Sequence, residues 1–148
     1  MFEFRPATSV DLPGILDLLR ELNPEDPELA ASDSGEIWAE ILGNSGIRYL
    51  VAVDSARIIG TCHILVVPNL TRSGRPYALV ENVVVASAHR RQGIGRRLMD
   101  LAVEFARLEH CYKVMIQSSA KRSEAHAFYQ DLAFDCEAKR SFVLQLPD

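Results

Sequence analysis

Apolar residues recur along this chain with two periods, one typical of helices and one typical of strands. Ile15, Leu18 and Leu22 follow the helical period, whereas Arg57–Val67 and Tyr77–Val85 are apolar runs of the kind that form buried strands. In chain order, these patterns predict a strand at 2–5, helices at 9–21 and 35–42, strands at 49–53, 57–67 and 77–85, a helix at 93–108, a strand at 113–118, a helix at 123–132, and strands at 134–137 and 141–146.

The segment 93–108 has the clearest helical pattern, with Ile94, Leu98 and Leu101 on one face. A right-handed crossover through this helix makes the strands before and after it parallel. The short connections between the three preceding strands favour antiparallel pairing. We therefore expect a single domain over 1–148, of class α/β (α+β), with a mixed, mostly antiparallel central sheet flanked by helices.

Composition limits the class of protein and its compartment. Hydrophobic residues make up 48% of the 148-residue chain and charged residues 24%, and the net charge is −4. This balance is typical of a globular domain and gives no reason to expect nucleic acid or a membrane as a partner. The three cysteines, Cys62, Cys111 and Cys136, are odd in number and widely spaced. With an N-terminus unlike a signal peptide, they favour a cytoplasmic protein without disulfides or a bound metal.

Positive charge nevertheless gathers at the start of the helix at 93–108, where four arginines fall within 90–97. Backbone N–H groups at a helix start have no intrahelical partner, and the macrodipole adds partial positive charge there. Glycines let a ligand approach the backbone closely, so this segment is suited to a pyrophosphate. The expected ligand-binding residues are Arg90, Arg91, Gln92, Gly93, Ile94, Gly95 and Arg96.

Other phosphate-binding motifs match this segment less well. A P-loop ends in Gly-Lys-Ser/Thr, whereas Gly95 is followed by Arg96 and Arg97. A dinucleotide-binding fingerprint needs a third glycine, and Leu98 occupies that position. A solvated basic helix that happens to begin with glycines remains the alternative without function.

The pattern Arg90-x-x-Gly93-x-Gly95 closely resembles the acetyl-coenzyme A signature of the GNAT superfamily of N-acetyltransferases, and the resemblance extends over Tyr77–Phe134. It implies a GNAT fold, acetyl-CoA as cosubstrate, and a pyrophosphate held largely by backbone N–H groups. It also implies that the preceding strand binds the pantetheine arm, in a gap where the parallel strands separate near Val85 and Ser118. The strand residues concerned are Val83, Val84 and Val85.

Acetyl transfer to an amine needs a base for the amine and a proton for the departing thiolate. Glu81 is the candidate base, because it stands in an otherwise apolar strand where burial raises a carboxyl pKa. Several GNAT enzymes resemble this chain in placing a glutamate on this strand. A structural glutamate that hydrogen-bonds a nearby loop is the alternative. In a regular strand, Asn82 points to the opposite face and has a structural role.

Tyr129 is the candidate acid. The sequence around Phe128-Tyr129 and Ala133-Phe134 resembles a second GNAT motif, in which a tyrosine hydroxyl lies near the coenzyme sulfur. Packing in the core is the alternative for Tyr129. Two residues depart from the motif. Ala133 replaces a glycine, so the turn must avoid or tolerate a positive φ. Arg122 replaces an asparagine that contacts the cofactor, so we expect altered contacts and retained binding.

These residues predict an N-acetyltransferase that acts on a primary amine of a small molecule or peptide, as a possible homodimer. The segments Glu81–Val85, 90–95 and Cys111–Val114 also resemble those of glucosamine-6-phosphate N-acetyltransferases. Arg72 and Arg75 lie in a polar loop and are candidates for an anionic substrate, a dimer partner or plain solvation. A coenzyme A-binding sensor without turnover is the alternative function.

Overall fold

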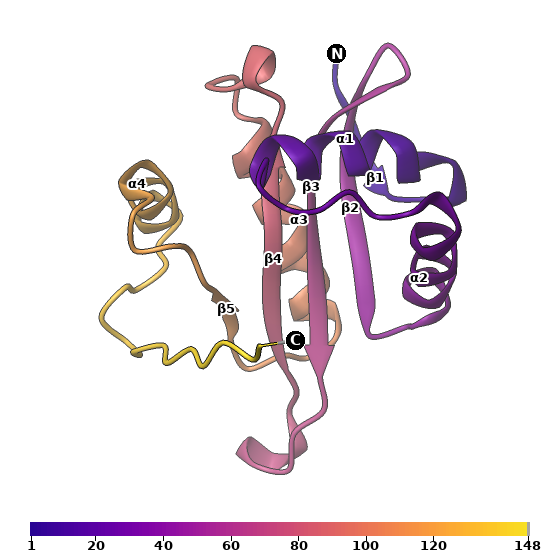
Figure 1. The fold of residues 1–148 in the computed structure, drawn as a ribbon. Coiled ribbons are helices and arrows are strands. Elements are labelled where there is room, and N and C mark those ends of the chain that lie inside the picture. Colours follow the sequence, from indigo (N-terminus) through magenta and orange to yellow (C-terminus); the bar gives the residue numbers. More distant parts are fainter. Residues whose placement is uncertain (148) are drawn as a thin grey trace. The chain divides into compact units, whose positions relative to one another are not determined.

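The computed structural model describes residues 1–147, which divide into two compact units after Met115 (Figure 1). The larger unit holds the sheet and three helices, and the smaller unit holds the last helix and the C-terminal segment. In chain order the elements are β1 (Glu3–Pro6), the 3-10 helix η1 (Ser9–Asp11), α1 (Leu12–Leu22), α2 (Ala31–Gly43), β2 (Ile47–Asp54), β3 (Arg57–Val67), the 3-10 helix η2 (Arg72–Gly74), β4 (Tyr77–Val85), the 3-10 helix η3 (Ser87–His89), α3 (Ile94–Leu108), β5 (Val114–Ile116) and α4 (Ser123–Asp131).

The five strands lie side by side in the order β1-β2-β3-β4-β5. The first four form antiparallel pairs. After the α3 crossover, β5 joins the edge beside β4, where the Ala78 N–H donates to the Lys113 carbonyl at 3.0 Å. The expected mixed, mostly antiparallel sheet flanked by helices is confirmed.

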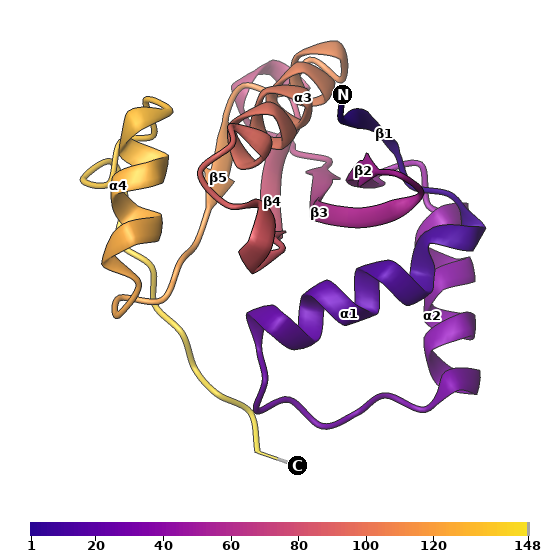
Figure 2. The same cartoon turned by 90° about the horizontal axis from the view of Figure 1, so that it is seen from above.

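Helices cover both faces of the sheet in the larger unit (Figure 2). One face carries α1, which packs on β3 and β4, and α2, which packs on β2, whereas α3 covers the other face. The helix α1 lies very close to β3, because a Cβ built on Gly14 would stand 2.6 Å from Ile58 Cγ1. Only a glycine at this point allows the observed approach.

The start of α1 is held by the buried carboxylate of Asp11. It accepts the Thr8 N–H at 2.7 Å and two hydrogen bonds from Arg5, at 2.7 and 2.9 Å. The Arg5 hydrogen bond is the main reason why the pKa of Asp11 falls from 3.8 to about 2. The contact between Arg5 and Asp11 therefore joins β1 to the start of α1, and α1 borders the candidate site.

Most predicted boundaries agree with the structure within a few residues, and β3 and β4 agree completely. The helix expected from Gly35 begins earlier, at Ala31, and the strand expected over 113–118 is confined to Val114–Ile116. Ser118 therefore lies outside β5, and the separation of the two parallel strands near Val85 stays a prediction.

The two strands expected at 134–137 and 141–146 are wrong, because the structure has no strand at either place. At the first, the Asp135 carboxylate accepts the Glu137 N–H at 2.9 Å, which closes a turn. At the second, the apolar side chains are exposed, with Phe142 at 91%. Apolar alternation predicts a strand only where a neighbouring strand pairs with it, and no ladder within residues 1–147 includes this segment.

Candidate active site

The junction between β4 and α3 forms a sharp turn that begins the long helix. Gly93 is the N-cap of α3 with φ +80° and ψ 0°, a left-handed conformation suited to glycine. Arg91 is also left-handed, with φ +63°. These two positions turn the chain from the end of β4 into the helix, so that the first helical N–H groups lie at the junction.

The residues of this junction fit a phosphate-containing ligand. The side of Gly93 where a Cβ would stand is open, with no atom within 4 Å. Arg91 and Arg96 are exposed, whereas the Ile94 side chain is 2% exposed and packs beside Gly60 of β3. Ile94 therefore anchors the start of α3 against β3. The backbone N–H groups of the helix start and the exposed arginines remain available to an anion.

Arg90 already has partners within the chain. Its Nε donates to the Val85 carbonyl at 3.1 Å, and its Nη2 donates to Glu21 Oε1 at 3.0 Å. Direct contact of Arg90 with a pyrophosphate stays a prediction, and so does contact of the Val85 main chain with a pantetheine amide. Glu21 was missed by sequence reasoning, because its partners lie more than sixty positions away.

The strand β4 is not regular at the candidate base. In its ladder with β3, Glu81 pairs with His63 and Val84 pairs with Thr61, so Asn82 and Val83 together oppose one residue, Cys62. This is a β-bulge, and Asn82 has φ +52°. The regular alternation expected for Asn82 is therefore wrong. Asparagine in an apolar strand was the available signal, because it tolerates the left-handed region better than most residues.

The bulge brings Asn82 into a polar row that runs across the sheet. Its Nδ2 lies 3.5 Å from His63 Nδ1, and its side chain also hydrogen-bonds the Tyr49 phenol. The rings of Tyr49 and His63 are 4.6 Å apart, and Trp38 of α2 packs edge-on against Tyr49. The row therefore lies on the face of the sheet covered by α1 and α2.

Glu81 lies beside this row and is partly buried. Burial raises its pKa, which brings the carboxylate closer to the strength needed by a general base near neutral pH. Burial also lowers the pKa of His63 to about 4, so His63 is neutral at pH 7. A histidine with so low a pKa is a weak base, so Glu81 remains the candidate base of this neighbouring pair.

The segment 13–134 matches the acetyltransferase (GNAT) family. The chain belongs to this family. GNAT enzymes transfer an acetyl group from acetyl-CoA to an amine, which is the reaction expected from the sequence.

Named GNAT relatives extend over most of the chain. A glucosamine 6-phosphate N-acetyltransferase of Trypanosoma brucei brucei is 33% identical over 134 residues, which are 89% of this chain and 88% of the relative. An acetyltransferase of Agrobacterium tumefaciens str. C58 is 40% identical, with a TM-score of 0.92 over 97% of this chain and 99% of that one. AAC(6')-Iy, solved with a bisubstrate analogue of coenzyme A, shares the fold at 17% identity, with a TM-score of 0.84 over 100% and 99%.

The second GNAT motif lies in the smaller unit, on α4 and the turn after it. The Tyr129 ring packs against Phe128 and Phe134, with centroids 5.2 and 6.2 Å away. Ala133 has φ +65°, so the turn tolerates alanine in the conformation that glycine prefers. Arg122 is the N-cap of α4, and its carbonyl accepts the His126 N–H at 3.1 Å. The roles of Tyr129 and Arg122 toward acetyl-CoA stay predictions.

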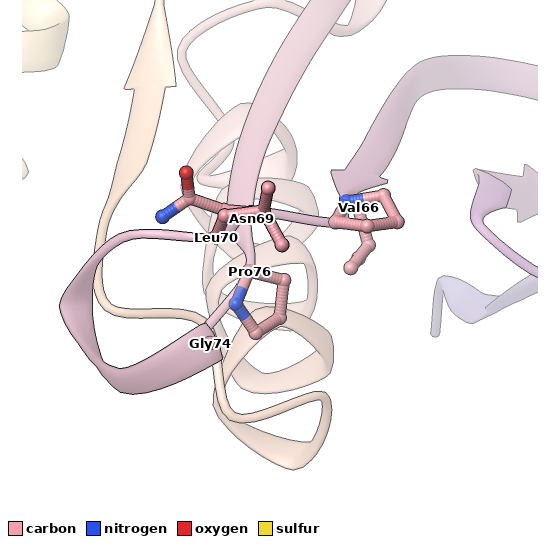
Figure 3. A pocket seen from close by; sticks show the side chains of 6 residues that line it. Val66, Asn69, Leu70, Gly74 and Pro76 are labelled. Carbon is pink, nitrogen blue, oxygen red and sulfur yellow. The ribbon is translucent and has the colours of Figure 1, made fainter.

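The loop after β3 borders an open hollow of about 420 Å³ (Figure 3). Its lining residues are Val66, Pro68, Asn69, Leu70, Gly74 and Pro76, none of which is titratable. In the same loop, Arg75 donates to the carbonyls of His110 at 3.2 Å and Cys111 at 3.0 Å, and Arg72 lies over the Tyr112 ring. Arg75 therefore links the loop after β3 to the turn after α3. These contacts favour a structural role for Arg75 over contact with an anionic substrate, contact with a dimer partner or plain solvation.

Neither a membrane nor a metal is indicated by the described part of the chain. None of its helices has the length and apolar character to cross a bilayer. Among residues 1–147, no three His, Cys, Asp or Glu side chains gather into a possible metal site.

Proposed function

We propose that this GNAT domain acetylates the primary amine of a small amino sugar, with glucosamine 6-phosphate as the first acceptor to test. Glu81 is the proposed general base and Tyr129 the proposed general acid. The observation that carries the proposal is the partly buried Glu81 at the bulge of β4, on the strand that leads directly into the Gly93 turn. Three relatives named as glucosamine 6-phosphate N-acetyltransferases, each 33–34% identical, support the choice of acceptor.

Acetyl-CoA supplies an activated acetyl thioester in this reaction. The backbone N–H groups at the start of α3, together with Arg91, Gln92 and Arg96, are proposed to hold the pyrophosphate. The main chain of Val83 and Val84 is proposed to align the pantetheine arm; the bulge leaves Val83 outside the ladder with β3, which resumes where Val84 pairs with Thr61. Arg122 is a further proposed cofactor-binding residue.

Glu81 takes a proton from the ammonium form of the acceptor, which frees the nitrogen lone pair to attack the acetyl carbonyl. As the new C–N bond forms and the C–S bond breaks, Tyr129 gives its hydroxyl proton to the departing sulfur, and the surplus proton on the new amide nitrogen returns to the tyrosinate. The neutral His63 and the Asn82 amide offer hydrogen bonds near the base without competing for that proton.

The test measures thiol release from acetyl-CoA with glucosamine 6-phosphate, glucosamine, an aminoglycoside and a peptide as separate acceptors. We expect turnover with glucosamine 6-phosphate to exceed turnover with each of the other three acceptors. Turnover with a different amine would refute the acceptor and keep the reaction. Binding of coenzyme A without turnover of any amine would instead support the alternative function, a coenzyme A-binding sensor without turnover.

A second measurement tests the cofactor site itself. Calorimetry of coenzyme A binding compares the wild type with Gly93→Val, which forces a β-branched side chain into a left-handed φ. We expect binding to weaken at least about tenfold, by the usual cost of such strain. Equal binding by the two proteins would show that the start of α3 is not the pyrophosphate site.

We also propose that the enzyme is cytoplasmic and forms a homodimer. The three cysteines are free in the structure, which supports a reducing compartment. Localisation of a tagged chain tests the first statement. Light scattering at several concentrations tests the second, and a mass that stays at 16.5 kDa would refute it.

A further inference from the structure

The turn between β4 and α3 is held by a carboxylate from a distant part of the chain. Glu21 lies in the last turn of α1. Its Oε1 accepts the Ser87 N–H at 2.8 Å and a hydrogen bond from Arg90 Nη2 at 3.0 Å. These partners are 66 and 69 positions away in the sequence. One carboxylate oxygen thus fixes both Ser87, which lies in η3, and Arg90, which follows η3.

Arg90 extends this contact to the sheet, because its Nε donates to the Val85 carbonyl at 3.1 Å. The guanidinium therefore bridges the end of β4 and the end of α1. The same turn is approached from another side by Asp54, whose Oδ2 lies 3.7 Å from His89 Nε2. The main-chain path from β4 to the Gly93 turn is therefore set by contacts from separate elements.

The position of Glu21 is unfavourable for the helix that carries it. The C-terminal end of α1 bears the negative pole of the helix macrodipole, which disfavours a carboxylate. Arg90 supplies the compensating positive charge from outside the helix. An acidic residue at this position is thus explained by the turn it holds and not by the stability of α1.

We propose that Glu21 is a positioning residue of the coenzyme A site. It fixes Arg90 and Ser87, and through them the direction in which the first N–H groups of α3 face the pyrophosphate. Arg90 then acts through Glu21 and Val85, while the exposed Arg91 and Arg96 remain for the ligand. This inference rests on the proposed binding of coenzyme A at the start of α3.

Because the Glu21–Arg90 pair is exposed to solvent, a positioning role can be measured separately from an effect on overall stability. The Arg90 side chain is 55% exposed and Glu21 is 33% exposed, so solvent screens their attraction and the pair adds little to overall stability. A matched control lies nearby, because Arg20 and Glu28 form an ion pair at 2.8 Å whose side chains are 56% and 77% exposed. That pair does not touch the turn after β4.

The experiment measures coenzyme A affinity by calorimetry in Glu21→Ala, Arg90→Ala, the double variant and Glu28→Ala. We expect each of the first two to bind about three- to tenfold more weakly, as for the loss of a charge-assisted hydrogen bond. The double variant should bind no more weakly than the worse single one, because both act through one contact. Glu28→Ala should match the wild type. With an accepted amine, KM for acetyl-CoA should rise while kcat at saturation stays within about twofold.

Three results would overturn the inference. Unchanged affinity in Glu21→Ala, with normal binding by the wild type, would refute it and leave the proposed function intact. Additive losses in the double variant would make Arg90 a direct phosphate ligand. Absence of binding by the wild type would instead refute the proposed function and this inference together. If Glu21→Ala does not fold, Glu21→Gln keeps an acceptor for Ser87 and loses only the charge, and the same comparison applies to it.

Discussion

Replacing Gly14 with alanine tests how closely α1 lies against the sheet. The added Cβ would stand 2.6 Å from Ile58 Cγ1 and 2.9 Å from Ile58 Cβ. Carbon atoms pack at about 3.5–4.0 Å, so the helix or Ile58 must move by about 1 Å. Such overpacking costs about 1–3 kcal/mol, and the better helix propensity of alanine returns at most about 1 kcal/mol. We expect the free energy of unfolding to fall by about 1–2 kcal/mol, after both effects.

The matched control is Gly35→Ala in α2, where an added Cβ would meet no atom within 4 Å. Only the propensity term applies there, so the free energy of unfolding should rise by about 0.5–1 kcal/mol. Urea denaturation of both variants measures the difference, which should be about 2 kcal/mol with an unchanged m-value. Because α1 also carries Glu21, Gly14→Ala should weaken coenzyme A binding as well. A Gly14→Ala protein as stable as the wild type would refute the close packing of α1 on β3.

Three further predictions concern single side chains. Tyr129→Phe should leave coenzyme A affinity nearly unchanged and lower kcat by about 10²–10⁴-fold, whereas wild-type turnover would make the tyrosine structural. Burial raises the pKa of Glu81, so wild-type activity should rise with pH through that raised value; Glu81→Gln should lose this limb, and its deficit should shrink at high pH as free amine accumulates, which a pH–rate profile checks. Asp11 has a folded pKa of about 2 against 3.8, so its contribution to stability is present above pH 3.8 and is lost as the pH falls toward 2. Asp11→Asn should therefore cost about 2 kcal/mol at pH 7 and flatten acid unfolding; equal acid midpoints in thermal melts would contradict this.

The local sequence pattern was sufficient to predict the bounds of elements that bury an apolar run. The strands β3 and β4 have their predicted bounds, because each is a mostly apolar run with buried residues spaced along it. It was insufficient at the C-terminus, where 141–146 alternates like a strand but has no ladder within the described chain. Strand formation there depends on a partner strand, and a single segment does not carry that information.

The residues of the candidate site also divide into those that a local sequence pattern reveals and those that depend on contacts between distant segments. Gly93 was predictable because a left-handed turn at a helix start favours glycine, and Glu81 because a carboxylate in an apolar strand stands out. The contact of Glu21 with Ser87 joins residues 66 positions apart, so no local spacing reveals it. The bulge at Asn82 depends on the register of β4 against β3, which only the paired strands determine.

The order of the strands in the sheet follows their order along the chain, and this has a consequence for folding. Ser55 and Ala56 alone separate β2 from β3, and a short loop separates β3 from β4, so closing these contacts loses little chain entropy. By contrast, β1 joins β2 only after both α1 and α2, and β5 joins β4 only after α3. Proteins with mostly local contacts fold quickly, and here the cheapest contacts are those of β2, β3 and β4. The three-stranded meander that carries Glu81 is therefore the part of the sheet able to form first, and the helices on either side of the Gly93 turn assemble on strands that are already paired.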